Sequence, residues 1–477
     1  MTDREQTMRQ AVQEELVKRV DDKDPYRQSF HLDAPTGLIN DPNGLVFFKG
    51  TYHLFFQWNP FETTHGAKFW GHATSTNLLT WKLQPPALAP VEWYEKNGCY
   101  SGSAVVWNEK LYLFYTGNVK SSNGRETYQC LATSDDGVTF HKQGPLVYLP
   151  KGYTAHFRDP KVVRQDDAWL MLIGAQTESG SGAVVSYKSD NLYDWSLDQV
   201  IDETKIDGAG EMGYMWECPD FIDYGEQNIL MMSPQGMEPN GLSFHNLFQS
   251  GYVVSSNNQI NLEQPFGPFK ELDHGFDFYA PQSYELPDGR RILIAWMGIS
   301  DEIEAFHPTI HNGWVHALTM PRELRWDGHN LLQSPVRELR EMRSSRKWEG
   351  SLLNGMTIPY SQSGTIELVV KPIDEGNDCF TLNFHDEVFL SYNKQTKRFT
   401  LKRRHLKTEM DEVRQCQLDE LTKLHVIIDQ SSIEVLINDG STTFTTRFFP
   451  DERTGILLQD GISCHVNMWV LDTSSNI

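Results

Sequence analysis

The sequence predicts an all-β protein: a five-bladed β-propeller followed by a C-terminal β-sandwich, with a short N-terminal helix. Short motifs recur at nearly even spacing, and each is followed by a strand–turn–strand pattern. The motifs are centred on Asp41, Tyr100, Asp159, Glu217 and Tyr279, which are 59, 59, 58 and 62 positions apart. Such a repeat predicts equivalent strands that direct polar residues to one place, as propeller blades do.

The N-terminal helix is predicted by apolar residues at helical spacing in a polar segment, residues 1–28. These residues are Met8, Val12, Leu16 and Val20. The spacing is that of an amphipathic helix. The segment has no apolar core of the secretory kind, so we expect a cytoplasmic protein.

The propeller is predicted for residues 29–335 because each motif precedes a β-hairpin, two apolar strands joined by a short polar turn. The five hairpins span residues 44–56, 103–115, 161–173, 221–232 and 283–296. Further strand signals follow them, and a unit of roughly 60 residues fits a four-stranded blade. Five such units predict five blades.

The remainder of the chain is predicted to hold a linker and a second β domain. Residues 336–349 are rich in charge and predict a linker with a helix. Residues 350–477 contain short alternating strands between polar turns and predict a β-sandwich. The strands are expected at 365–370, 380–384, 424–428, 432–437 and 466–471. No carboxylate motif recurs there, so we expect this domain to be non-catalytic.

The composition excludes several classes of partner. The 477 residues carry a formal net charge of -22, which disfavours binding to nucleic acid or to an anionic membrane. No run of 18 apolar residues predicts a membrane span. The charge also means that an anionic substrate needs a local basic patch.

The cysteines and histidines predict no metal site and no cofactor. Six cysteines lack close pairing or zinc spacing, so we expect free thiols. His307 and His311 have the spacing of helical metal ligands, but Pro308 between them argues against a helix. We interpret them as loop residues.

The carboxylates of the repeat predict glycosidic bond hydrolysis, which needs two carboxyl groups on opposite sides of the anomeric carbon. Asp41 and Glu217 can supply this pair, with Asp159 as a third carboxylate. Arg158 is expected to keep Asp159 ionised by paired hydrogen bonds. Glu217 is expected to have a raised pKa as the acid. Asp220 is expected to be a hydrogen-bonding neighbour.

These stretches resemble glycoside hydrolase family 32, the invertase and fructanase family. The resemblance rests on the Asn-Asp-Pro-Asn-Gly, Phe-Arg-Asp-Pro and Glu-Cys-Pro-Asp motifs at 40–44, 157–160 and 217–220, and covers residues 29–477. It implies a five-bladed propeller with a β-sandwich, and a retaining double displacement. It also implies Asp41 as nucleophile and Glu217 as general acid/base, with Asp159 stabilising the transition state.

The resemblance also implies residues that contact the sugar. Polar contacts to the fructosyl unit are expected from Asn40, Gln57, Ser101 and Arg158, and pocket contacts from Trp70, Tyr100, Tyr279 and Trp296. The chain departs from the family at 65–68, where a tryptophan is often found and where it carries His65 and Lys68. This departure favours an anionic group on the leaving sugar; the alternative is a solvated loop.

The function predicted from these features is hydrolysis of the β-fructofuranosyl bond of sucrose 6-phosphate or sucrose. An alternative enzyme function is hydrolysis of inulin or levan. A non-catalytic sugar-binding propeller is an alternative of another class, although all three carboxylates are present. The sequence leaves open whether the chain forms a homo-oligomer.

Overall fold

The structure is a computed structural model that describes residues 3–18, 24–122, 124–207, 212–225, 227–255, 265–300, 302–359, 364–373, 378–460 and 463–473. These residues form one α-helix, α1 (Asp3–Lys18), short 3-10 helices and many strands, so the chain is all-β as predicted. The 3-10 helices are η1 (Trp93–Glu95), η2 (Glu203–Lys205), η3 (Glu304–Phe306), η4 (Pro308–Asn312), η5 (Arg337–Met342) and η6 (Asn438–Gly440).

The predicted N-terminal helix is confirmed in α1. Val12 is fully buried, and Met8 and Leu16 pack against the same hydrophobic cluster, which includes residues of the first sheet. Val20 lies outside the described residues. The helix is therefore held by its apolar side.

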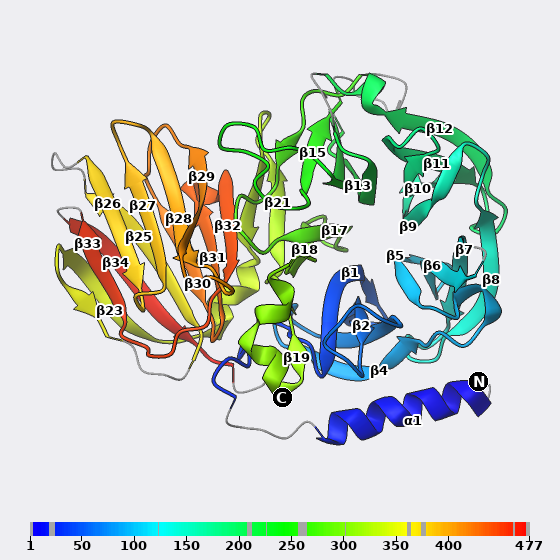
Figure 1. The fold of residues 1–477 in the computed structure, drawn as a ribbon, viewed down its shortest axis with the longest axis horizontal. Coiled ribbons are helices and arrows are strands. Elements are labelled where there is room, and N and C mark those ends of the chain that lie inside the picture. Colours follow the sequence, from blue (N-terminus) through cyan, green and yellow to red (C-terminus); the bar gives the residue numbers. More distant parts are fainter. Residues whose placement is uncertain are drawn as a thin grey trace.

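Five sheets follow α1, and their first hairpins are the five predicted from the sequence (Figure 1). The first sheet has the order β19-β1-β2-β3-β4, with β1 (Gly37–Phe48), β2 (Thr51–Asn59), β3 (Phe69–Ser75), β4 (Lys82–Leu88) and β19 (Trp314–Val315). The second has the order β5-β6-β7-β8, with β5 (Cys99–Trp107), β6 (Lys110–Ser121), β7 (Gly124–Ser134) and β8 (His141–Tyr148).

The other three sheets of this group have a similar build. The third contains β9 (Tyr153–Gln165), β10 (Ala168–Thr177), β11 (Gly182–Ser189) and β12 (Ser196–Asp202). The fourth contains β13 (Met215–Asp223), β14 (Asn228–Gln235), β15 (Gly251–Val254) and β16 (Lys270–Glu271). The fifth contains β17 (Tyr279–Glu285), β18 (Arg291–Met297), β20 (Ala317–Leu318), β21 (Arg322–Trp326) and β22 (Leu331–Pro335).

The first strands of these sheets surround a common centre. Strand β1 contacts β5, β5 contacts β9, β9 contacts β13, β13 contacts β17, and β17 contacts β1 (Figure 1). The predicted motifs lie on these five strands. The arrangement therefore directs residues that are far apart in sequence to one place.

Two further six-stranded sheets pack face to face beside this group (Figure 1). One has the order β23-β34-β25-β30-β31-β32, with β23 (Arg343–Leu353), β25 (Ile366–Ile373), β30 (Leu424–Ile428), β31 (Ser432–Ile437), β32 (Thr442–Arg447) and β34 (Ser463–Leu471). The other has the order β24-β33-β26-β27-β28-β29, with β24 (Thr357–Ile358), β26 (Cys379–Phe384), β27 (Val388–Asn393), β28 (Arg398–Arg404), β29 (Asp411–Gln417) and β33 (Ile456–Asp460). Their facing apolar side chains form one buried cluster.

Two local expectations differ from the structure. Strand β23 begins at Arg343, within the segment expected as a linker, because it pairs with β34 along its length. His311 lies in the 3-10 helix η4 rather than in an irregular loop, since Pro308 occupies the first helical turn, where it is tolerated. His307 is buried before this helix, with its ring near that of His316.

A buried ionic network joins the two groups of sheets. His31, near the start of the first group, bonds Asp429 at 2.9 Å and Glu434 at 2.7 Å. Arg322 on β21 also donates from Nε to Glu434 at 2.8 Å. Because removing one member leaves a buried charge unpaired, such contacts fix the two groups relative to each other.

Candidate active site

The motif residues are placed by irregularities in the five inner hairpins. The pairing register shifts between Ile39 and Pro42, Tyr100 and Gly102, Glu217 and Asp220, and Tyr279 and Gln282; the β9–β10 pair shifts beside Asp159. Such bulges turn side chains in a new direction and are common beside active sites. Asp159, Cys218 and Ala280 also share a positive φ, which non-glycine residues rarely adopt.

Close packing of β10 against β13 brings two of the motifs together. Gly174 on β10 pairs with Arg158 on β9. A Cβ at position 174 would lie 2.2 Å from the carbonyl oxygen of Trp216, so this approach requires glycine. Glu217, the next residue, is thereby held beside Arg158.

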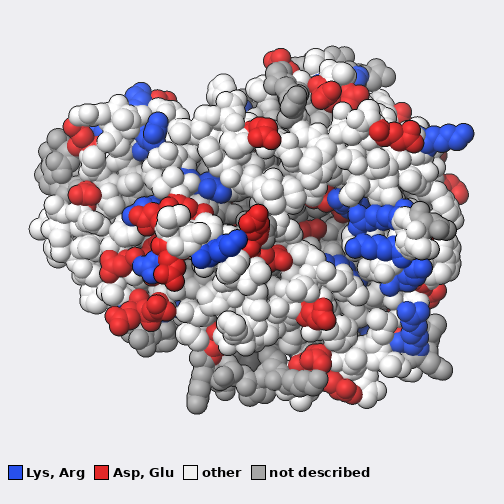
Figure 2. All heavy atoms as spheres, viewed as in Figure 1, with Lys and Arg blue, Asp and Glu red and all other residues white. Residues whose placement is uncertain are grey.

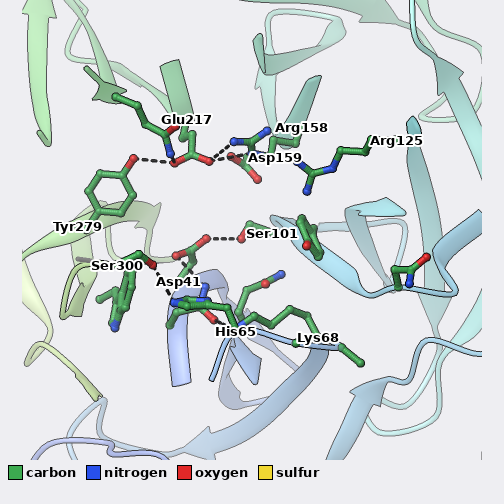
Figure 3. Close-up of a pocket in the computed structure, with 18 of the residues that line it drawn as sticks. Asp41, His65, Lys68, Ser101, Arg125, Arg158, Asp159, Glu217, Tyr279 and Ser300 are labelled. Carbon is green, nitrogen blue, oxygen red and sulfur yellow. Dashed lines mark hydrogen bonds and ion pairs between the residues drawn. The ribbon is translucent and has the colours of Figure 1, made fainter. Parts of the chain in front are cut away.

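The motif residues line a cavity of about 400 Å³, a size typical of small-molecule sites (Figure 3). The cavity contains twelve of the thirteen predicted site residues: Asn40, Asp41, Gln57, His65, Lys68, Tyr100, Ser101, Arg158, Asp159, Glu217, Tyr279 and Trp296. Trp70 is the exception, because it is fully buried and its indole N–H donates to the Tyr100 carbonyl at 3.0 Å. It supports the wall from behind.

Asp41 lies on β1 with both carboxylate oxygens hydrogen-bonded. Ser101 Oγ donates to Oδ2 at 2.5 Å, and Asn40 Nδ2 donates to Oδ1 at 3.1 Å (Figure 3). Burial raises the pKa of Asp41 and the charge of Glu217 adds to this, while the Ser101 hydrogen bond opposes it. The two donors fix the direction of the carboxylate.

Glu217 lies on β13 and accepts more hydrogen bonds than the other two carboxylates. Arg158 Nε donates to Oε1 at 2.7 Å, while Gln235 Nε2 and the Tyr279 hydroxyl each donate to Oε2 at 2.6 Å. Burial favours a raised pKa for Glu217, but the charge of Arg158 and these hydrogen bonds outweigh it, and the pKa is lowered. The expected pairing of Arg158 with Asp159 and the expected raised pKa of Glu217 are both wrong for this structure.

Asp159 lies on β9, and the charges of both Glu217 and Asp41 act on its carboxyl group. Its Oδ2 accepts from the backbone N–H of Cys218 at 3.1 Å. Burial and then the negative charge of Glu217 raise the pKa of Asp159 to about 7, although Arg158 opposes the shift. This raised pKa brings the titration of Asp159 close to neutral pH.

The two basic residues of the departing segment are engaged with the protein. Lys68 is buried and its Nζ donates to Asn40 Oδ1 at 2.6 Å; burial lowers the pKa of Lys68 to about 7. His65 Nε2 lies 2.8 Å from Ser300 Oγ and 3.1 Å from Glu304 Oε2. Lys68 is thus buried with a lowered pKa, and His65 faces the Glu304 carboxylate, so neither has the exposed position expected of a basic loop residue.

Asp220 has the hydrogen-bonding role expected of it. It is buried, accepts from the backbone N–H of Ser283 at 2.5 Å, and pairs with Lys161 at 3.1 Å. It thus joins the fourth and fifth sheets.

Several lining residues were missed by the sequence analysis: Lys96, Asn97, Lys120, Arg125, Gln235, Phe248 and Ser300. They lie outside the repeated motifs. The pairing of β13 with β14 places Gln235 opposite Met215, two residues before Glu217. Pairing these two strands as a hairpin could therefore have found Gln235. Over the described residues, no group of three or more His, Cys, Asp or Glu has the arrangement of a metal site, and no helix is long and apolar enough to span a membrane.

Comparison with known proteins identifies similar chains along almost the whole length. The model for the glycosyl hydrolases family 32 N-terminal domain matches residues 31–335, and that for the family 32 C terminal matches residues 344–467. A sucrose-6-phosphate hydrolase of Bacillus subtilis (strain 168) is 45% identical over 94% of this chain and 95% of its own length.

Solved structures of similar proteins agree with this match. The sucrose-6-phosphate hydrolase from Lactobacillus gasseri has a TM-score of 0.86 and 28% identity, covering 97% of this chain and 96% of that one. A mutant Bombyx mori GH32 beta-fructofuranosidase in complex with sucrose has a TM-score of 0.84 and 29% identity, covering 98% of both chains.

Proposed function

The chain belongs to glycosyl hydrolase family 32, and we propose that Asp41, Asp159 and Glu217 carry out its reaction, the hydrolysis of the β-fructofuranosyl bond of sucrose 6-phosphate and sucrose. It is a glycosidase, as its sucrose-6-phosphate hydrolase relatives are. The observation that carries the residue assignment is the convergence of three carboxylates from three different sheets on one cavity.

The fold is interpreted in the same terms. We infer that the five sheets around the common centre are the blades of a five-bladed propeller, and that the two six-stranded sheets form a β-sandwich. The proposed division is a helical extension at 1–28, the catalytic propeller at 29–335, a linker at 336–349 and the sandwich at 350–477. The extents of the two family matches support this division.

The proposed first step transfers the fructosyl group to the protein. A carboxylate oxygen of Asp41 attacks the anomeric carbon, the bond from that carbon to the leaving-sugar oxygen breaks, and Glu217 gives its proton to this oxygen. The product is a fructosyl ester of Asp41 and free glucose 6-phosphate or glucose. Ser101 and Asn40 support the step by holding the attacking carboxylate in one orientation.

The second step releases fructose. Glu217, now ionised, removes a proton from water, whose oxygen attacks the anomeric carbon as the bond to Asp41 breaks. Two displacements at one carbon retain the β configuration. Asp159 is proposed to accept hydrogen bonds from fructosyl hydroxyls that strengthen in the transition state.

The proton that Glu217 needs is proposed to come from Asp159. The pKa of Glu217 is lowered and that of Asp159 is raised to about 7. Hydroxyl donors of a bound sugar favour the ionised form of Asp159, so its proton passes to Glu217 as the substrate enters. The titration then belongs to the pair of carboxylates rather than to either one.

The substrate assignment is tested by comparing kcat/KM for sucrose 6-phosphate, sucrose and inulin, with the released sugars identified. The account predicts glucose 6-phosphate and fructose from the first substrate, and glucose and fructose from the second. A higher kcat/KM for inulin than for both would favour the fructan-hydrolase alternative. The cytoplasmic location expected from the sequence stays a prediction, which cell fractionation can test.

A further inference from the structure

One wall of the cavity carries three cations for which the proposed chemistry gives no role. They are Lys96, which follows η1, Lys120 at the end of β6, and Arg125 at the start of β7. All three belong to the region of the second sheet and are named here the cationic wall. Figure 2 shows basic side chains gathered beside the central hollow, over the part of the molecule where Figure 1 places this sheet.

Lys120 and Arg125 lie directly opposite each other in the register of β6 and β7. Opposed residues of an antiparallel pair place their side chains on the same side of the sheet, and like charges there destabilise the pair. Within the described part of the chain, Lys96, Lys120 and Arg125 form no ion pair with a carboxylate. In a chain of net charge -22, this concentration of unpaired positive charge indicates an anionic ligand.

Arg125 is held in a defined position on this wall. Its Nε donates to Asn118 Oδ1 at 2.7 Å, and its guanidinium lies 5.4 Å from the centre of the Tyr100 ring. Burial, and then the charge of Arg158, lower the pKa of Arg125, while Tyr100 and the charge of Glu217 oppose this shift. A planar guanidinium of this kind suits a phosphate group, which it can contact through two parallel hydrogen bonds.

We propose that the cationic wall of Lys96, Lys120 and Arg125 binds the phosphate group on the leaving sugar of sucrose 6-phosphate. The inference rests on the proposed function, which places the fructosyl unit against Asp41, Asp159 and Glu217. Asp159 is buried and Asp41 and Glu217 are half-buried, whereas Lys96 and Lys120 are exposed. The cavity thus has a floor for a neutral sugar ring and a rim for a dianion.

The sequence suggested residues 65–68 for contact with an anionic leaving sugar, and the cationic wall is proposed in their place. Lys68 is buried and its pKa is lowered to about 7, and His65 contacts the Glu304 carboxylate, whereas Lys96 and Lys120 are exposed. A phosphate carries about -1.5 to -2 charges at neutral pH, and the flexible lysine ammonium groups can contact it as point charges.

The test measures the ratio of kcat/KM for sucrose 6-phosphate to that for sucrose in wild type and in Lys120→Gln, Lys96→Gln and the double variant. The matched control is Lys110→Gln, because Lys110 begins the strand that Lys120 nearly ends, and it pairs with Asp135 at 3.3 Å outside the cavity. One charge-assisted hydrogen bond corresponds to about a tenfold change or more. Each single variant is expected to lower the ratio about tenfold, the double variant further, and the control not at all.

A second arm identifies the source of the phosphate. Inhibition of sucrose hydrolysis is measured with glucose 6-phosphate, glucose and inorganic phosphate. Glucose 6-phosphate should inhibit wild type most strongly, and the double variant should lose this advantage over glucose. Stronger inhibition by inorganic phosphate than by glucose 6-phosphate would overturn the assignment to the leaving sugar.

Failure of the inference differs from failure of the proposed function. If wild type hydrolyses both substrates and the double variant keeps the wild-type ratio, the cationic wall does not bind the phosphate and the inference is overturned alone. If wild type releases fructose from neither substrate, the proposed function is overturned first. Thermal unfolding of each variant shows that a changed ratio comes from a folded protein.

Discussion

Arg158 and Glu217 form the closest charge contact in the candidate active site, with the Nε and NH2 groups of the arginine 2.7 and 2.6 Å from the same oxygen, Oε1 (Figure 3). The other oxygen of Glu217 accepts from Gln235 and Tyr279. The ionised form of Glu217 is therefore well stabilised before substrate binds. To act as the general acid, Glu217 must therefore gain a proton in the substrate complex.

Replacing Arg158 should change the pH dependence of the reaction. The Arg158 charge lowers the pKa of both Glu217 and Asp159, so Arg158→Gln should raise both. The basic limb of the kcat/KM profile, which reports loss of the proton shared by these groups, should lie near pH 7 in wild type and move to higher pH in the variant. We also expect kcat/KM to fall about a hundredfold, since a buried cation is lost.

Tyr279→Phe provides the comparison, because it removes one neutral hydrogen bond to Glu217 and no charge. Its basic limb should move in the same direction by a smaller amount. An unchanged basic limb in Arg158→Gln would show that another group controls it.

Replacing Asp41 should prevent formation of the covalent intermediate. Asp41→Asn keeps the size of the side chain but removes the nucleophilic charge, and turnover should fall roughly thousandfold or more. Ser101→Ala, which removes only the 2.5 Å hydrogen bond to Asp41, should keep measurable activity. Steady-state rates with sucrose check both variants, and a similar loss in the two would argue against the nucleophile assignment.

Replacing Glu217 should slow hydrolysis by an amount that depends on the leaving group of the substrate. A general acid contributes about 10²–10⁴ in rate, so Glu217→Gln should lose activity on sucrose to this extent. An aryl fructoside with a nitrophenolate leaving group needs little protonation and should lose much less in the first step. Pre-steady-state release of nitrophenolate measures that step; equal losses on both substrates would remove Glu217 from the acid role.

The buried contacts of His31 between the two groups of sheets should make the free energy of unfolding fall as the pH rises from 6.5 to about 9. Burial lowers the pKa of His31, but its hydrogen bonds to Asp429 and Glu434 outweigh this and raise the pKa to about 9. The stabilisation is complete below the ordinary value of 6.5 and is lost as the pH rises through about 9, a difference of roughly 3 kcal/mol. His31→Gln should therefore have a lower Tm than wild type at pH 6, and the gap should narrow towards pH 9.

The control for this experiment is His141→Gln, because His141 is exposed on β8. Its Tm should follow that of wild type across the whole range. A gap between wild type and His31→Gln that stays constant from pH 6 to 9 would show that His31 is not protonated in the folded protein.

The hairpins and the phase of the motifs could be predicted because both depend on local pattern: apolar strands, polar turns and evenly spaced carboxylates. The partner of Arg158 could not. Adjacency in sequence suggested Asp159, but the positive φ of Asp159 and the register shift beside it set the directions of the two side chains. Arg158 Nε donates to Glu217 on the next sheet instead.

The charge state of other side chains also depended on the fold. Lys68 belongs to a basic segment in the sequence, but in the fold it is buried, with its Nζ bonded to Asn40. The cationic wall has no motif, because Lys120 and Arg125 meet only through the register of β6 and β7. Both features depend on tertiary pairing that a single sequence does not display.

The most direct test of the proposed reaction is product analysis after the purified protein acts on sucrose 6-phosphate in a mixture of methanol and water. A retaining displacement through Asp41 predicts release of glucose 6-phosphate together with fructose and methyl β-fructofuranoside, and product formation by Asp41→Asn that is slower by roughly a thousandfold or more. Formation of methyl α-fructofuranoside, or of a methyl glucoside 6-phosphate in place of the fructoside, would contradict the account.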